Sequence, residues 1–464
     1  MLLPFLSAIL GIIAFLPFNF WPLSFIFLIP LFIFFLKEER FWRLILGVFI
    51  FRFIFALGAV YYTLEPITWT TSIMIFLGLP ISVFIIKRPL LFKKEFSFFQ
   101  NRKILFILPF LWTLFDHLAA RYSFLPTYII VAGNALGSSP FLGLAAINGL
   151  ILMTFFVVGI NALIAFFALK IKISSWKFRA LGGFAVVAVL IASWQISKIA
   201  IQKNSTNYRS LKNSLKIAVI SSNRKFATKI DSLDSDVYSL KKELRGKETD
   251  LIIFPEDATF GSLPLAQNLS KELNADIAAT FDTFQNGKRY NSTILLNKNG
   301  EIVDIYNKNQ LTFIGEYWPL GGWRPFFFNW LKKNKPQYEN YAVFNPENPY
   351  YRGEKKMLEI NNVKFASLIC LEAHYPNDLK EYKKMGIKFF INPSSNRWID
   401  LGTRHFLYLN TNLRKIFSVW LETPIVVSGV EDFAGIIVPD GKTDLINYDS
   451  QDKNYAVFFG EIGY

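Results

Sequence analysis

The chain contains a single cysteine, Cys370, and two side chains capable of acid–base chemistry follow it closely. Cys370 ends an alternating apolar run that is typical of a buried strand, and Glu372 and His374 come directly after it. A thiol at this position can face a pocket beyond the strand, as a nucleophile must. A lone cysteine is more often a small buried apolar side chain without chemistry. The adjacent acid and imidazole favour the nucleophile, because a purely structural strand would continue apolar or turn with Gly and Asn.

Two other polar motifs follow predicted strands. Glu256 comes after an apolar run, and Lys308 comes after another, with Glu316 eight residues further on. The ordinary interpretations are a solvated acidic turn and a surface lysine. However, burial beside apolar residues raises the pKa of a glutamate toward neutrality, as a general base requires. Because a nearby base and cation make a thiolate accessible, the motifs together predict covalent catalysis by Cys370.

The strands that would position these motifs begin at about residue 214. They alternate with amphipathic helical patterns at residues 228–245 and 404–422 and with Asn-Gly and Asp-Gly turns. The predicted strands are residues 215–220, 250–254, 277–281, 292–296, 302–306, 363–369, 387–392, 425–428, 435–438 and 455–459. This pattern predicts one α/β domain over residues 204–464, without a detectable internal repeat.

Residues 1–203 are far more apolar than the rest of the chain. Overall, hydrophobic residues make up 52% and aromatic residues 17%, and the mean hydropathy is +0.30, which exceeds the values of ordinary soluble proteins. A helix that crosses a bilayer needs about 20 mainly apolar residues. Seven such spans are predicted, at residues 3–18, 21–36, 43–63, 68–87, 104–121, 141–169 and 180–199. No small-residue cleavage site follows the first, so we expect it to be a retained span and not a signal peptide.

Basic residues concentrate in alternate loops of this region. Those in the loops after the second, fourth and sixth predicted spans are Lys37, Arg40, Arg43, Lys87, Arg88, Lys93, Lys94, Arg102, Lys103, Lys170, Lys172, Lys177 and Arg179. Short cytoplasmic loops retain Lys and Arg, so we expect a cytoplasmic N-terminus and an extracytoplasmic domain after the seventh span. The net charge of +15 is partly this signal and requires no nucleic-acid partner.

Polar residues also occur within the apolar half. Asp116 and His117 fall inside the fifth predicted span, where ionisable groups are costly and usually face a cavity or each other. They could serve function or form a satisfied contact between helices, and the sequence leaves both interpretations open. Residues 133–138 are too polar and glycine-rich to continue a helix, which predicts a re-entrant or surface segment.

Considered together, these motifs resemble the nitrilase superfamily, in which a Glu, a Lys and a Cys occur in this chain order. With a multi-span membrane region in front, the resemblance narrows to the bacterial apolipoprotein N-acyltransferase family and covers nearly the whole chain. The matching motifs are residues 15–22, 254–258, 306–320, Cys370-Leu371-Glu372 and 395–398. The sequence departs from the family at Leu371, where an aromatic residue is common. We also expect it to lack the family's usual final span.

The resemblance implies a multi-span α-helical membrane domain over residues 1–203, followed by an α/β nitrilase-like α-β-β-α sandwich. It implies a catalytic triad of Glu256, Lys308 and Cys370, supported by Glu316 and Glu372, with no metal or cofactor. The implied reaction moves an acyl chain from a membrane phospholipid, through a Cys370 thioester, to the N-terminal amine of a diacylated apolipoprotein. This is the last step of bacterial lipoprotein maturation, so the implied location is the inner membrane with a periplasmic catalytic domain.

Two other classes of function fit the same residues. The first is a membrane-tethered nitrilase-like amidase or hydrolase that uses the same triad on water. The second is an idle lipid- or lipoprotein-binding membrane protein, which would have no reason to keep all three catalytic side chains. Residues 317–351 are rich in Trp, Phe and Lys, a composition that favours an arm at the membrane interface over an ordinary packed insertion.

Overall fold

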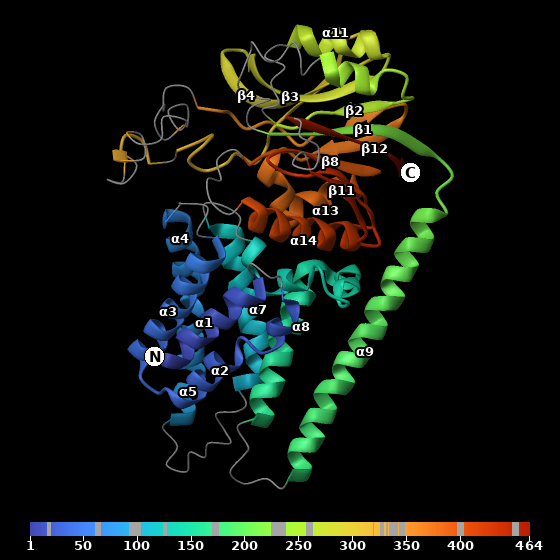
Figure 1. Ribbon diagram of the computed structural model, residues 1–464. Coiled ribbons are helices and arrows are strands. Elements are labelled where there is room, and N and C mark those ends of the chain that lie inside the picture. The colour runs from blue at the N-terminus through green and yellow to red at the C-terminus, as the bar shows by residue number, and fades with distance from the viewer. Residues whose placement is uncertain are drawn as a thin grey trace. The chain divides into compact units, whose positions relative to one another are not determined.

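The structure is a computed structural model in which two compact units are formed by one chain (Figure 1). It describes residues 1–15, 20–60, 66–91, 104–123, 128–168, 176–223, 238–256, 263–318, 320–324, 329–330, 333, 342, 349–396, 403–447 and 454–464. The first unit comprises Met1–Asn207, Ile399–Glu422 and Pro439–Gly441, and the second comprises Tyr208–Trp398, Thr423–Val438 and Lys442–Tyr464. The chain therefore leaves the second unit twice before it ends there.

The first unit consists of helices. They are α1 (Leu2–Phe15), α2 (Ile29–Lys37), α3 (Phe41–Val60), α4 (Pro66–Phe76), α5 (Gly78–Leu91), α7 (Ile104–Tyr122), α8 (Ala145–Ala168), α9 (Trp176–Arg209) and α14 (Thr403–Leu421), with the short turn η1 (Trp21–Phe25). Among the described residues, four segments are long and apolar enough to cross a membrane: Phe41–Ala59, Ile104–Tyr122, Leu142–Ala168 and Ala180–Arg209. Three shorter apolar segments, Leu2–Phe15, Trp21–Lys37 and Thr71–Lys87, overlap the remaining predicted spans. That all seven cross the bilayer stays a prediction.

Aromatic side chains hold the first unit together around Trp112 of α7. The Trp112 ring contacts Phe51 edge-on at 5.7 Å and Phe76 at 4.9 Å between centroids, and it also meets Phe32 at 6.1 Å. Such pairs add about 0.5–1.5 kcal/mol each beyond the burial of their area. Since these rings come from α2, α3, α4 and α7, Trp112 is a common packing point of four helices.

The ionisable pair of the fifth predicted span makes contacts between elements of this unit. Asp116 of α7 accepts a hydrogen bond from Arg52 of α3 at 2.6 Å and another from the backbone N–H of Ala132 at 2.9 Å. His117 lies 3.3 Å from the hydroxyl of Thr154 on α8. The structure thus places both residues in polar contacts between elements, which was one of the two interpretations left open.

The glycine-rich segment at residues 133–138 overlaps the buried 3₁₀ turn η4 (Ala132–Leu136), which lies in the chain between two others, η3 (Tyr128–Ile130) and η5 (Leu142–Leu144). A Cβ atom on Gly133 would lie 2.5 Å from the backbone nitrogen of Thr154, so only glycine fits this close approach. The Asn134 side chain donates to the carbonyl of Leu409 in α14 at 3.1 Å. The segment is therefore an internal support for α14 within the first unit, and most of it is not surface.

The second unit contains one hydrogen-bonded set of strands in the order β5-β4-β3-β2-β1-β9-β8-β7-β6, with β10 beside β9, β11 beside β10 and β12 beside β1. The strands are β1 (Ser214–Ser222), β2 (Leu251–Ile253), β3 (Asp276–Gln285), β4 (Lys288–Leu296), β5 (Ile302–Asn307), β6 (Leu358–Ile360), β7 (Val363–Ser367), β8 (Phe389–Ser395), β9 (Ile425–Val430), β10 (Ala434–Ile437), β11 (Thr443–Ile446) and β12 (Tyr455–Gly463). All ten predicted strands are present. The short β6 and the half-exposed β11 were not predicted, because neither has a run of apolar residues long enough to stand out.

The two halves of this strand set enclose one core. One half is β1–β5 and the other is β6–β9. A single register pair, Ser222 with Val430, joins the halves between β1 and β9. Leu295 from one half and Phe365 from the other belong to the same buried cluster, and the hydroxyls of Thr293 and Ser367 meet across it at 2.7 Å. A second buried cluster packs the opposite face of β1–β4 against α11 (Leu263–Leu273). This is the layered architecture expected of a nitrilase-like sandwich.

Two predicted features are only partly described. The helix predicted at residues 228–245 is helical from residue 238, and residues 224–237 lie outside the described part. Most of the aromatic arm at 317–351 also lies outside it. The helix predicted at residues 404–422 is α14, which the contacts group with the first unit even though its sequence lies between β8 and β9.

Candidate active site

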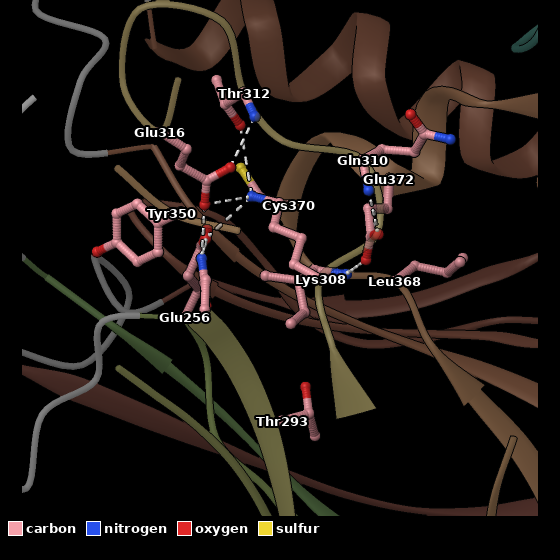
Figure 2. Close-up of polar contacts among 12 residues, drawn as sticks. Glu256, Thr293, Lys308, Gln310, Thr312, Glu316, Tyr350, Leu368, Cys370 and Glu372 are labelled. Atoms are coloured by element: carbon pink, nitrogen blue, oxygen red, sulfur yellow. Dashed lines mark hydrogen bonds and ion pairs between the residues drawn. The ribbon is translucent and has the colours of Figure 1, made fainter. Parts of the chain in front are cut away.

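The strand order of the second unit brings three sequence motifs to one place. Glu256 follows β2, Lys308 follows β5 directly, and Cys370 begins the 3₁₀ turn η7 (Cys370–His374) after β7. All three lie within the second unit. The side chains that point toward one another in Figure 2 are those of Glu256, Lys308, Glu316 and Cys370. The residues predicted from the sequence thus form one cluster, although the first, Glu256, and the last, Cys370, are more than 100 positions apart in the chain.

Lys308 is the centre of this cluster. Its ammonium group lies 2.9 Å from Oε1 of Glu316 and 3.5 Å from Oε1 of Glu256, and Thr312 Oγ1 is 3.4 Å away. Lys308 is 1% exposed and Glu256 is 6% exposed, so these charges are almost completely removed from water. Because an unpaired buried charge is costly, the closer carboxylate, Glu316, is the main counter-ion of Lys308. The second carboxylate remains for other chemistry.

The pKa values of the Lys308 ammonium and the Cys370 thiol are both raised, but for different reasons. Burial lowers the pKa of Lys308, but Glu316 and Glu256 outweigh it and hold that pKa well above the usual value. Burial and the charge of Glu256 raise the pKa of Cys370 well above its ordinary value, against the opposing effects of Lys308 and a backbone hydrogen bond from Ser395. The site at rest therefore holds a charged lysine beside a neutral thiol, and the thiol needs a base to ionise.

Glu372 connects the Lys308 loop to the Cys370 turn. Its Oε1 accepts hydrogen bonds from the backbone N–H groups of Asn309 and Gln310 at 2.8 and 2.9 Å, and from the Tyr306 hydroxyl at 2.8 Å. Its Oε2 accepts from the backbone N–H of Ile369 at 2.8 Å. Burial raises the pKa of Glu372 to about 7, although these donors and Lys308 oppose the rise. Glu372 thus fixes the position of both loops.

The backbone at Cys370 is held in an uncommon conformation. Its φ is +56°, a left-handed value that a residue with a side chain rarely adopts without compensation. The Asn392 side chain supplies compensation, since it donates to the carbonyls of Leu368 at 2.5 Å and Cys370 at 3.1 Å. The strained turn directly after β7 thus fixes the backbone of Cys370, whose side chain packs against the buried cluster of the strands.

The structure adds residues that the sequence did not reveal. Asn291 of β4 donates to Glu256 and to Glu316, and the backbone N–H of Thr312 donates to Glu316 at 2.6 Å. An asparagine inside a strand has no spacing signal, so only the fold could identify it. Asp116 and His117 belong to the first unit, and Arg397 and Trp398 lie outside the described residues.

Two known protein families match separate parts of the chain. Residues 237–410 match the carbon-nitrogen hydrolase family, and residues 7–163 match the family described as the apolipoprotein N-acyltransferase N-terminal domain. The fold and site thus define a protein in which membrane-type helices are joined to a catalytic domain of the carbon-nitrogen hydrolase class. With both matches in one chain, the protein is similar to the bacterial apolipoprotein N-acyltransferases over most of its length.

Curated relatives cover most of the chain. Apolipoprotein N-acyltransferase of Aquifex aeolicus is 25% identical over 363 residues, which are 75% of this chain and 73% of the relative. The enzyme of the same name from Haemophilus influenzae is 25% identical over 425 residues, 86% of this chain and 77% of the relative. Among solved structures, the nitrilase-superfamily member Nit3 of Saccharomyces cerevisiae covers 55% of this chain and 91% of its own, at 15% identity and a TM-score of 0.38.

Proposed function

We propose that this protein is an N-acyltransferase that moves a fatty acyl chain from a membrane phospholipid to the N-terminal amine of the diacylglyceryl-cysteine of an apolipoprotein. Similarity to apolipoprotein N-acyltransferases supports the reaction, and it does not favour the hydrolase alternative. The observation that carries the chemistry is the burial of Glu256 and Lys308 in one cluster with the chain's single thiol. This arrangement suits covalent catalysis at Cys370.

In the first half-reaction, Glu256 takes the thiol proton while the sulfur of Cys370 attacks the ester carbonyl of the phospholipid. Glu256 suits this role because Lys308 is held more closely by Glu316 than by Glu256. The Lys308 ammonium stabilises the negative charge that develops on the carbonyl oxygen. The C–O ester bond then breaks, and Glu256 returns the proton to the leaving oxygen of the lysophospholipid. The product is an acyl thioester on Cys370.

In the second half-reaction, the free α-amine of the diacylated lipoprotein attacks the thioester carbonyl. Glu256 takes a proton from the amine, the C–S bond breaks, and the proton passes to the sulfur, which restores the thiol. The same base and the same cation thus serve both halves. Water must react poorly with the thioester for transfer to compete, so the arrangement requires a site that the acceptor fills.

The location of these steps follows the same proposal. The apolar helices of the first unit would anchor the protein in the bacterial inner membrane, where its phospholipid donor resides. The distribution of basic residues supports a cytoplasmic N-terminus and a periplasmic second unit. Lipoproteins carrying a free diacylglyceryl-cysteine amine would then meet the site on the outer side of that membrane.

A burst experiment tests this function. Purified full-length protein is mixed with phospholipid in the absence of an acceptor, and Cys370 is examined by mass spectrometry. We expect an acyl adduct on Cys370 and a burst of lysophospholipid equal to the enzyme concentration. A diacylated lipopeptide with a free amine should then remove the adduct and become triacylated, whereas an N-blocked lipopeptide should leave it intact.

The matched control is Cys370→Ala, which should give neither adduct nor burst. Continuous release of lysophospholipid and free fatty acid, with the lipopeptide still diacylated, would instead identify a hydrolase. That result would overturn the proposed transfer while leaving the role of the thiol intact.

A further inference from the structure

Asn291 contacts both carboxylates of the site. Its side-chain nitrogen donates to Oε1 of Glu256 and to Oε1 of Glu316, each at 2.8 Å. An amide nitrogen carries two hydrogens, so each carboxylate can receive one. The same two oxygens face the Lys308 ammonium, at 3.5 and 2.9 Å. Asn291 and Lys308 therefore serve the same pair of acids.

The strand register fixes Asn291 in this position. Ser292 of β4 pairs with Asn307 of β5, so Asn291 lies beside Lys308, and the Lys308 backbone N–H donates to the Asn291 carbonyl at 2.8 Å. Side chains alternate along a strand, so Asn291 shares its face with Thr293, whose hydroxyl meets Ser367 in the interior. Asn291 is 8% exposed. Its amide is thus anchored by a paired strand and does not depend on a loop.

Two carboxylates around one ammonium create an electrostatic problem. Like charges that share a buried site tend to bind one proton between them, and a protonated acid cannot act as a base. Hydrogen bonds donated to a carboxylate favour its ionised form. Asn291 gives one such bond to each acid and carries no net charge, so it helps both acids stay ionised without competing with Lys308.

Other charged and titratable groups face this pair from each neighbouring element. Cys370 of η7 interacts electrostatically with both acids, and Glu372 of the same turn acts on Lys308. Arg289 of β4 and Tyr350 act on Glu316. Asn291 differs from these groups because it is uncharged and donates one hydrogen bond to each acid.

We propose that Asn291 is a positioning residue that keeps Glu256 available as the base and Glu316 as the counter-ion of Lys308, by donating one hydrogen bond to each. This inference rests on the proposed function, because it concerns the acylation of Cys370 by phospholipid. It predicts that loss of Asn291 affects the protonation of the base and not only the packing of the strand.

The test measures the rate of thioester formation on Cys370 between about pH 5.5 and pH 9 in full-length protein. Removing a hydrogen bond to a charged group should move the acid limb of the profile of Asn291→Ala upward by about one to two pH units. Acylation at pH values well below the original midpoint should then be about 10- to 100-fold slower. Near pH 9 the rate should return toward that of the unmodified protein.

Two further variants separate positioning from stability. Asn291→Asp keeps the shape of the side chain but removes the donors at neutral pH, and it should shift the acid limb at least as far, even if Asn291→Ala folds poorly. Thr293→Val is the matched control, because it deletes a buried hydrogen bond from the same face of β4 without contact to the acids. Its acid limb should stay at the original pH.

The outcomes distinguish failure of the positioning role of Asn291 from failure of the proposed function. If the unmodified protein forms no thioester, the proposed function fails. If the unmodified protein forms the thioester but the Asn291 variants keep its pH midpoint, the positioning role is wrong, whatever their rates. An equal shift in Thr293→Val would likewise overturn it, since a general loss of packing would then explain the effect.

Discussion

Replacing Lys308 by methionine keeps the length of the side chain but leaves Glu256 and Glu316 buried together without their shared ammonium. We expect the folded variant to take up one proton, because two unscreened carboxylates in one site repel each other. Protonating a carboxyl whose ordinary pKa is about 4.3 costs about 4 kcal/mol at pH 7 and about 1 kcal/mol at pH 5. The cost at pH 7 agrees with the range of about 3–5 kcal/mol for breaking a buried ion pair.

Proton linkage gives the direction in which the stability of the Lys308→Met variant changes with pH. The folded variant binds one proton more than its unfolded chain, so its free energy of unfolding should fall as the pH rises from 5 to 7. For a domain of about 150–250 residues, each kcal/mol shifts the unfolding midpoint by about 2–4 °C. The loss relative to the unmodified protein should therefore be about 8–16 °C at pH 7 and about 2–4 °C at pH 5.

Glu316→Gln is the matched comparison. It leaves Lys308 with Glu256 at 3.5 Å, so one cation still faces one anion. The expected loss is that of one charged hydrogen bond, about 1.5–3 kcal/mol, with little dependence on pH over this range. The unfolding midpoints of the unmodified protein, Lys308→Met and Glu316→Gln are measured at both pH values. Thermal unfolding in detergent is followed by tryptophan fluorescence. Equal losses for Lys308→Met at pH 5 and pH 7, or a larger loss for Glu316→Gln at pH 7, would refute the charge assignment.

Further predictions concern catalysis, pH and topology. Cys370→Ala should abolish the acyl adduct, and Glu256→Gln should slow its formation by about 10²–10⁴-fold with the protein still folded and membrane-inserted; normal turnover in either would contradict the mechanism. The raised pKa of Glu372, about 7 in the folded state, disfavours its charge, so stability should fall by about 3 kcal/mol as the pH rises from about 4.5 to about 7. Glu372→Gln should remove that trend, which chemical denaturation at several pH values can show. Cysteines introduced near Lys93 should label only from the cytoplasm and those near Asn286 only from outside, and the reverse pattern would exclude a periplasmic site.

Much of the site could be predicted because its main residues follow strands that the sequence marks clearly. Glu256, Lys308 and Cys370 each come after a short apolar run, and such runs are recognisable from period and composition alone. Each motif alone had a simple structural explanation. Their combination in one chain order predicted covalent catalysis before any geometry was known, and the long apolar runs predicted the membrane-type helices in the same way.

Other features could not be predicted, because they depend on which segments meet in space. Asn291 is an ordinary polar residue in a strand until the register of β4 and β5 places it beside Lys308. The pattern of α14 requires one buried face, but it does not specify the partner, and the structure shows that Asn134 of the first unit is one of its contacts.

Local sequence determined which segments became helices or strands and which side chains could react, because periodicity and residue type act over a few neighbouring positions. Tertiary structure alone decided how the charges are divided: Glu316 lies at 2.9 Å from Lys308, and Glu256 lies at 3.5 Å. It also decided that the thiol rests protonated, since burial and the nearby carboxylates raise the pKa of Cys370. These properties depend on distance and on the exclusion of water, which are set only when residues far apart in the chain pack together.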